Sequence, residues 1–160
     1  MKKMILTGLI LLGSSSAFAG IQDYIGRFDL QKQELEDGTF CYQGLIITKE
    51  GQEISLFRSD ATEFAIIRSD LNSSREVRYS HGEAMSTTKG TDSVTLKSDG
   101  SLLLQFSGVE SFLGVPASRV KDAMALKLSD DKKTLFAVRK TADGLAGLSR
   151  GEARCVYQRQ

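Results

Sequence analysis

The amino-acid sequence predicts an all-β protein, a single antiparallel meandering β-barrel or sandwich of about eight to ten strands with at most one or two short helical turns. Two observations lead to this class. After residue 20, short apolar runs follow one another, and many of them alternate with polar side chains. Turn residues interrupt these runs at intervals of about ten residues, a spacing typical of all-β domains. The sequence leaves the choice between barrel and sandwich open.

The first strands are bounded by turn dipeptides at 37–38 and 50–51, each of which is an acidic residue followed by Gly. We expect one strand to end near Leu35, a longer strand over 40–48 and a third over 53–57. Further strands are expected over 63–68, 75–80, 124–128, 134–140 and 153–158.

A tight hairpin is predicted at Asp99-Gly100. Apolar residues alternate with polar ones over 93–97 before this dipeptide and over 102–107 after it. Such a turn needs positive φ angles, which Asp and especially Gly tolerate. The segment "LSDDKK" is expected to form a second turn, between the strands at 124–128 and 134–140.

Helical signals are few. A turn or two is expected over 117–122, because Pro116 can occupy the first turn of a helix and Val120 and Met124 lie at four-residue spacing. Another short helical turn is expected over 20–25. Three segments rich in Gly, Ser, Thr or Asp are expected to be flexible loops, near Asn72, Gly90 and Gly144.

The amino-terminal segment has the arrangement of a cleaved secretory signal. Lys2 and Lys3 precede a short apolar run, and small residues ending in Ala17-Phe18-Ala19 follow it. We therefore expect a signal peptide over 1–19, a single β domain over 20–160, and a periplasmic or secreted protein. The apolar run is much shorter than the roughly 20 residues that cross a bilayer, so the protein is not expected to span the membrane.

The charges are nearly balanced, with 21 Lys and Arg against 20 Asp and Glu. They are dispersed along the chain, and no basic stripe of the kind expected in a nucleic-acid-binding protein is visible. Nucleic acid is therefore not an expected partner.

The two cysteines, Cys41 and Cys155, are expected to form a disulfide. An even pair in a small exported domain usually means one bond in an oxidising compartment. Two separate buried thiols are the alternative. A metal site is not expected, because His81 is the only histidine and no C-x-x-C pair is present.

The catalytic patterns in the chain do not predict an enzyme. "GLSRG" places Ser149 in a G-x-S-x-G pattern, but a nucleophile elbow needs a strand before the serine, a helix after it and a histidine further along. Here a strand is expected to follow Ser149, and His81 precedes it. The S-x-x-K pattern occurs three times and lacks its partner motifs. His81 and Glu83 would share one face if they lay on a strand, and a histidine there could act as an acid or base. We expect His81 instead to be an exposed or hydrogen-bonded turn residue, and no cofactor motif is visible.

The segment "YIGRFDL" resembles the Gly-x-aromatic opening of lipocalin-like barrels, with Gly26 and Phe28 at the motif positions. Lipocalins usually have tryptophan at the second position, and this chain has none. In that family an arginine on the closing strand often packs over the aromatic ring, and Arg154 is the expected match. The resemblance implies a cup for a small apolar molecule, lined by side chains such as Tyr42, Phe64, Ile66, Tyr79, Leu104 and Phe106.

The same apolar and aromatic residues could equally fill the core of a small β protein, so the ligand cup has an alternative. We expect an exported, non-catalytic binding protein whose partner is either a small apolar ligand or another envelope or extracellular protein. In the second case loops or a sheet edge would make the contact, for example through Arg75 and Arg78 near Tyr79. An outer-membrane barrel is disfavoured, because most apolar runs are shorter than the 9 to 11 residues of such strands.

Overall fold

The computed structural model describes residues 19–36, 38–81, 86–144 and 149–160. In this part of the chain one short helix and ten strands follow one another, as the alternating pattern predicts. The elements are α1 (Ile21–Tyr24), β1 (Gly26–Leu35), β2 (Gly44–Glu50), β3 (Glu53–Arg58), β4 (Ala61–Asp70), β5 (Ser73–His81), β6 (Ser86–Leu96), β7 (Leu102–Phe112), β8 (Val115–Leu128), β9 (Thr134–Asp143) and β10 (Ser149–Arg159). The predicted signal segment 1–19 lies, except for Ala19, outside the described residues.

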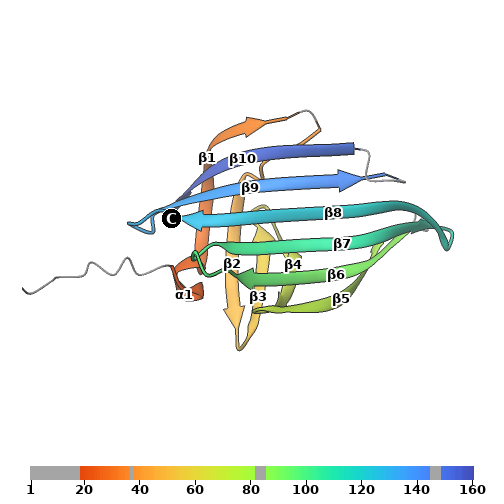
Figure 1. Ribbon diagram of the computed structural model, residues 1–160, viewed down its shortest axis with the longest axis horizontal. Helices are drawn as coiled ribbons and strands as arrows, with labels where there is room; N and C mark the ends of the chain where they lie inside the picture. Colours follow the sequence, from red (N-terminus) through yellow and green to blue (C-terminus); the bar gives the residue numbers. More distant parts are fainter. Residues whose placement is uncertain (1–18, 37, 82–85, 145–148) are drawn as a thin grey trace, which may run out of the picture.

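All ten strands belong to one antiparallel sheet in the order β4-β3-β2-β1-β10-β9-β8-β7-β6-β5. The long strands β5 to β10 lie side by side in one layer, and β2 to β4 cross behind them (Figure 1). The sheet therefore curls into a nearly closed barrel, and the barrel rather than the sandwich is confirmed. Its two edge strands, β4 and β5, meet at a seam.

Strand β1 joins the two layers. Gly26 to Asp29 pair with β2, and Phe28 to Leu35 pair with β10, so Phe28 and Asp29 have a neighbouring strand on both sides. The register with β10 shifts between Leu30 and Lys32. Such an irregularity bends a strand and increases its twist, which allows one strand to belong to both layers.

The core consists of the inward-facing residues of nearly every strand. Strand side chains point alternately to the two faces of a sheet, so every second residue of the alternating runs faces the interior. The largest fully buried side chains are Tyr24, Phe28, Leu45, Ile47, Ile54, Leu56, Ile67, Leu102, Leu104, Leu126, Leu135 and Tyr157.

One end of the barrel is covered by α1, the helical turn expected over 20–25. The ring of Tyr24 is fully buried, and its hydroxyl donates to the carbonyl oxygens of Gly100 (2.8 Å) and Leu126 (3.2 Å). The first of these lies in the predicted Asp99-Gly100 hairpin, which is present between β6 and β7, with Gly100 at φ 78°. Helix α1 is thereby attached to the turn and to β8.

The arginine that packs over Phe28 is Arg159, and the expectation that it would be Arg154 is wrong. The Arg159 guanidinium lies 4.6 Å from the centroid of the Phe28 ring, and it donates to the carbonyl oxygens of Asp23, Ile25 (2.8 Å) and Lys132 (3.0 Å). A Cβ on Gly26 would lie 2.9 Å from this guanidinium. Arg154 instead pairs with Glu152 at the surface.

The predicted disulfide between Cys41 and Cys155 is present, with the two Cα atoms 5.9 Å apart. It attaches the connection between β1 and β2 to the middle of β10. Both cysteines are buried among the core residues.

Two local predictions are wrong. Residues 117–122, expected to be helical, lie in β8, which is 14 residues long. Pro116 stands at its start, where the register between β7 and β8 shifts, and a proline is tolerated at such an irregularity. The segment near Gly90, expected to be a loop, is the middle of β6.

Gly90 explains the second error. It lies opposite Gly108 on β7, and the ring of Phe106 covers both glycines. A Cβ on Gly90 would lie 2.6 Å from that ring and 2.5 Å from the carbonyl oxygen of Ser107. The glycine thus marks a close approach of strands rather than a turn.

Candidate functional site

The seam between β4 and β5 is where the barrel is least regular. At one end of the seam, Leu71 bridges to Val94 on β6, and the backbone N–H of Asn72 donates to the Val94 carbonyl (2.7 Å). The Asn72 side chain accepts a hydrogen bond from the N–H of Leu96 (3.0 Å). Further along, side chains rather than a strand ladder connect β4 to β5 and β6.

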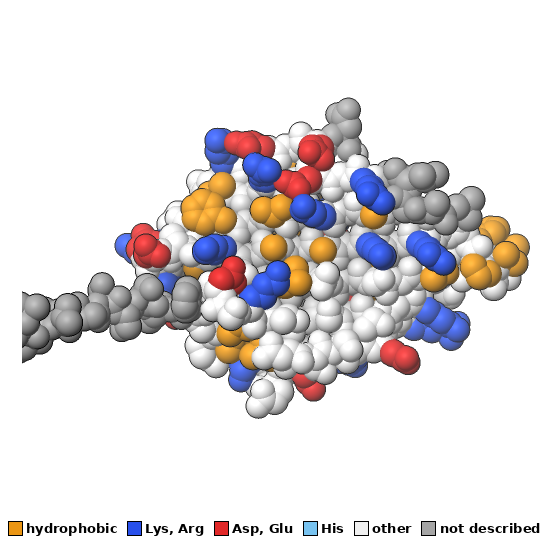
Figure 2. Space-filling view, viewed as in Figure 1, with side chains coloured by type: hydrophobic (Ala, Val, Ile, Leu, Met, Phe, Trp, Pro, Cys, Tyr) orange, Lys and Arg blue, Asp and Glu red, His pale blue; other side chains and the backbone are white. Residues whose placement is uncertain are grey.

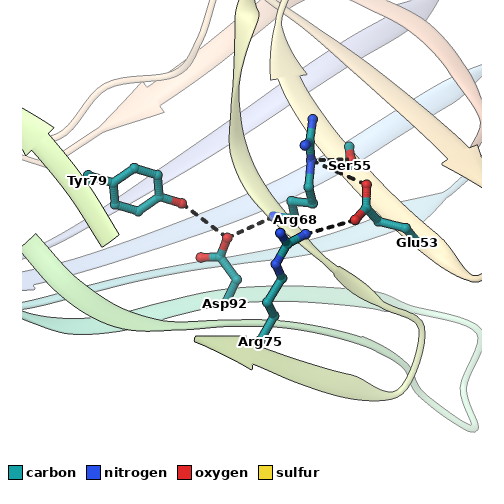
Figure 3. Close-up of polar contacts among 6 residues, drawn as sticks. All are labelled: Glu53, Ser55, Arg68, Arg75, Tyr79 and Asp92. Carbon is teal, nitrogen blue, oxygen red and sulfur yellow. Dashed lines mark hydrogen bonds and ion pairs between the residues drawn. The ribbon is translucent and has the colours of Figure 1, made fainter. Parts of the chain in front are cut away.

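Asp92 on β6 makes the central connection (Figure 3). Its side chain is fully buried, and Oδ2 accepts hydrogen bonds from the N–H of Arg68 on β4 (2.9 Å) and from the hydroxyl of Tyr79 on β5 (3.2 Å). The carboxylate thus links three strands across the seam. Among the described residues, its other oxygen, Oδ1, is buried without a hydrogen-bond partner.

The surroundings change the acidity of both groups. Burial raises the pKa of Asp92, and the hydrogen bonds from Arg68 and Tyr79 only partly oppose this. Burial, followed by the charge of the nearby carboxylate, raises the pKa of Tyr79 to about 12. Tyr79 is therefore protonated at neutral pH and acts as a hydrogen-bond donor.

A second set of polar contacts crosses the seam nearer to the surface. Glu53 on β3 pairs with Arg75 on β5 (2.9 Å) and with Arg68 on β4 (3.4 Å). Arg68 also donates from Nε to the hydroxyl of Ser55 (3.2 Å). The side chains of Glu53, Arg68 and Arg75 are partly exposed, and ion pairs between such side chains each contribute little to stability. These contacts orient Arg75 beside Asp92 and hold the guanidinium of Arg68 against Glu53 and Ser55, as Figure 3 shows.

A cleft of about 320 Å³ opens at this seam. The side chain of Phe64 is 78% exposed at its lining, which is unusual for so large an apolar group. Tyr79 also lines the cleft, and its ring packs edge-on against Phe106 with 5.9 Å between centroids. The lining residues are Glu63, Phe64, Ala65, Arg68, Arg75, Glu76, Val77, Arg78, Tyr79 and Asp92. This combination can hold an apolar group and a hydrogen-bonding group side by side.

A separate buried ion pair lies inside the barrel. Arg139 on β9 donates three hydrogen bonds to the carboxylate of Asp122 on β8, at 2.6, 3.0 and 3.2 Å. Its guanidinium lies 4.2 Å from the ring centroid of Phe40 and 4.8 Å from that of Tyr42. Because the disulfide at Cys41 holds both aromatic residues in place, this cluster serves to anchor the connection between β1 and β2.

The structure brings together only part of the predicted ligand-lining set. Phe64 and Tyr79 line the seam cleft, and Phe106 contacts Tyr79. Ile66 is partly buried against the core, and Leu104 is fully buried within it. Tyr42 packs edge-on against Phe40, 5.3 Å between centroids, and does not line the cleft.

The sequence reasoning missed Asp92 and Arg68. Asp92 lies two residues before Val94, so the strand period places its carboxylate on the same inward face as a core residue. A charged residue at two-residue spacing from an apolar, inward-facing residue is the sequence signal that could have identified this buried carboxylate. The prediction of a loop near Gly90 hides this signal, because side chains in a loop do not alternate between two faces.

The residues of the rejected catalytic patterns are placed only in part. Ser149 begins β10, so a strand follows it, as expected, where a nucleophile elbow would have a helix. His81 ends β5, and Glu83 and Gly147 lie outside the described residues.

No protein-family model, no curated protein and no solved structure matches this chain. The fold and the site therefore define the class: a ten-stranded antiparallel barrel with a disulfide and a polar cleft at its seam. Within the described residues, no helix is long and apolar enough to cross a membrane.

Proposed function

We propose that this protein is an exported binding protein that holds a small, largely apolar molecule in the seam cleft without transforming it. The observation that carries the proposal is the pairing of a solvent-exposed aromatic side chain, Phe64, with a buried, half-satisfied carboxylate, Asp92, at one cleft. A ligand that covers Phe64 would remove its apolar surface from water, and a donor group on that ligand would pair with Asp92 Oδ1 when the side chains that bury this oxygen move aside.

The chemistry of the lining favours a ligand with a hydroxyl or amine group. The unpartnered oxygen of Asp92 is an acceptor, and leaving a buried acceptor unsatisfied costs about 1–3 kcal/mol. A donor on the ligand can recover part of that cost. Phe64 and the ring of Tyr79 offer apolar surface for the remainder of the molecule.

The same lining favours binding over catalysis. The described lining residues include no serine, cysteine or histidine that could act as a nucleophile. With its pKa raised to about 12, Tyr79 is far from the range in which a general acid or base works best at neutral pH. Export is supported by the disulfide, since such bonds persist in oxidising compartments.

The first experiment is native mass spectrometry of the protein purified from its own envelope, followed by a denaturing measurement. A small molecule released on denaturation is the expected result. The denatured mass should correspond to a chain that begins at Gly20 and lacks two hydrogens. A bound polypeptide in place of a small molecule would support the alternative, a protein-binding module.

The cleft itself is tested by titration with 1-aminoanthracene, a flat apolar fluorophore with an amine donor. Phe64→Ser should weaken binding at least fivefold, whereas Phe136→Ser, which truncates an exposed Phe outside the cleft lining, should leave it unchanged. Asp92→Asn should weaken binding of 1-aminoanthracene but not of 1-methylanthracene, which lacks the donor. Equal effects of the two Phe substitutions would exclude the cleft as the site.

A further inference from the structure

The hairpin between β7 and β8 carries an apolar tip. Phe112, Leu113 and Val115 are 54%, 62% and 66% exposed, and Pro116 beside them is exposed as well. Figure 1 shows this hairpin extending beyond the other strands at one end of the molecule, and Figure 2 shows apolar side chains gathered at that extremity. Three large exposed apolar side chains at one hairpin tip are a concentration of apolar surface of the kind that marks an interaction site.

Three cations lie in one row across the outer face of the sheet. The register pairs Arg78 with Lys89, Lys89 with Val109 and Val109 with Arg119. Residues opposite each other in a sheet point to the same side, so these side chains share one face, and all three cations are exposed. Charges that are dispersed in the sequence are thus brought into a line by strand pairing.

These cations are free to act on a partner. Within the described part of the chain, Arg78, Lys89 and Arg119 make no ion pair, whereas Lys140 and Arg154 on the same sheet both pair with Glu152. Lys121 adds a fourth exposed cation on β8. Glu76 is an acid close to this row, but the cluster remains positive. Figure 2 shows basic side chains toward the hairpin end of this face and acidic ones mainly elsewhere.

The cation row lies close enough to the apolar tip for both to reach one membrane surface. Arg119 lies four residues from Val115, which is about 13 Å along a strand. Because the row is in register, Arg78 and Lys89 lie at the same height. Apolar groups of interfacial proteins enter about 5–10 Å into the boundary between headgroups and acyl chains. Insertion of the tip therefore brings the row close to the headgroups.

We propose that this end of the barrel binds the surface of a bilayer containing anionic phospholipid, with residues 112–115 inserted and Arg78, Lys89 and Arg119 on the headgroups. The protein docks on the membrane through this hairpin and does not cross it there. An anionic polymer would neutralise the row but leave the apolar tip in water, so a membrane fits both features. The proposal is independent of the seam cleft.

The test is flotation of the full mature chain with vesicles of phosphatidylcholine, alone or with about 30% phosphatidylglycerol. Binding to the mixed vesicles should exceed binding to neutral ones at least tenfold, and rising salt should reduce it. The triple substitution Arg78→Gln, Lys89→Gln, Arg119→Gln should weaken binding by roughly fivefold per cation removed. The matched triple Lys97→Gln, Lys127→Gln, Lys133→Gln, at the opposite end of the strands, should change it far less.

Insertion is tested separately with a fluorescent reporter. The chain contains no tryptophan, so Leu113→Trp gives a single signal that should shift to the blue with mixed vesicles and be quenched by brominated acyl chains. Phe136→Trp on the same sheet should show neither effect. The proposal is overturned if the fluorescence of the tryptophan at position 113 does not change with vesicles. It is also overturned if the double variant Phe112→Ser/Leu113→Ser binds the vesicles as well as the parent chain does. Equal binding to heparin by that double variant would then point to an anionic polymer.

Discussion

Asp92 carries a carboxylate at an inward-facing position of β6, where the strand pattern predicts an apolar core residue. Burial raises its pKa, so the folded protein holds the proton more tightly than the unfolded chain does. The ionised form therefore lowers the free energy of unfolding at pH values above the folded pKa. This cost disappears as the pH falls below the unfolded value of about 3.9.

Asp92→Asn should consequently stabilise the protein relative to the parent chain more at about pH 8 than at about pH 3.5. Urea unfolding at a series of pH values measures this difference. Asp131→Asn serves as the opposite control, because the Ser129 hydroxyl lowers the pKa of Asp131. That variant should lose stability at neutral pH, with the loss vanishing in acid. A D92N difference that does not vary with pH would contradict the assignment.

The contribution of Arg139 to the free energy of unfolding depends on its partner, Asp122. Arg139→Met removes the buried member of an ion pair whose other member, Asp122, is partly exposed, which should cost about 1.5–3 kcal/mol of unfolding free energy. The double variant Arg139→Met/Asp122→Leu should regain most of that loss, since well-packed apolar residues often replace a buried pair at little cost. Chemical denaturation measures both, and a double variant no better than the single one would argue against this account.

Strands β6 and β7 face each other at a pair of glycines, Gly90 and Gly108, where neither has room for a Cβ atom. Gly90→Ala would place a methyl group against the Ser107 carbonyl and the Phe106 ring, and we expect it to cost about 1–3 kcal/mol, as overpacking does. Ser93→Ala on the outer face of β6 should cost within about 0.5 kcal/mol. Thermal unfolding of the two variants compares them directly. Similar melting temperatures would show that the strands can separate to admit the methyl group.

The same two strands show where local sequence patterns fail. A glycine inside a polar run has the composition of a loop, and only the position of Gly108 on the next strand reveals the close contact. Residues 117–122 have helical spacing, but their neighbours β7 and β9 impose a strand. In both cases the secondary structure is decided by pairing with strands that are distant in the sequence. A short stretch of sequence does not show which strand will be its neighbour.

The disulfide acts on the whole chain, because 114 residues separate its cysteines. In the chain-entropy model, closing a loop of on the order of 100 residues contributes about 4.7 kcal/mol. Cys41→Ala/Cys155→Ala should therefore lower the free energy of unfolding by roughly that amount, and reduction of the parent chain should do the same. Guanidinium denaturation with and without reductant measures it. A loss below about 1 kcal/mol would mean that the reduced chain retains its own constraints.

For the molecule as a whole, the sequence predicted the class but only fragments of the site. The alternation of apolar and polar residues and the turn dipeptides are visible within a few consecutive residues. Strands such as β3 and the β6–β7 hairpin are therefore predictable from them. The sequence predicts Phe64 and Tyr79 as lining of an apolar cup, and in the structure they line the seam cleft, most of whose other lining residues are charged. Asp92 and Arg68 meet only because the sheet curls until β4 approaches β6, which no local pattern reports.

Because β1 pairs with β10, the first strand of the barrel cannot complete its pairing until the last strand is available. A chain that leaves the ribosome or a secretion channel from its amino end presents β1 long before its partner, and closing so distant a contact is slow. Until β10 arrives, Phe28 lacks the Arg159 that covers it and Cys41 has no second thiol to meet. The barrel therefore stays open during synthesis, and it closes only after its last strand has been made.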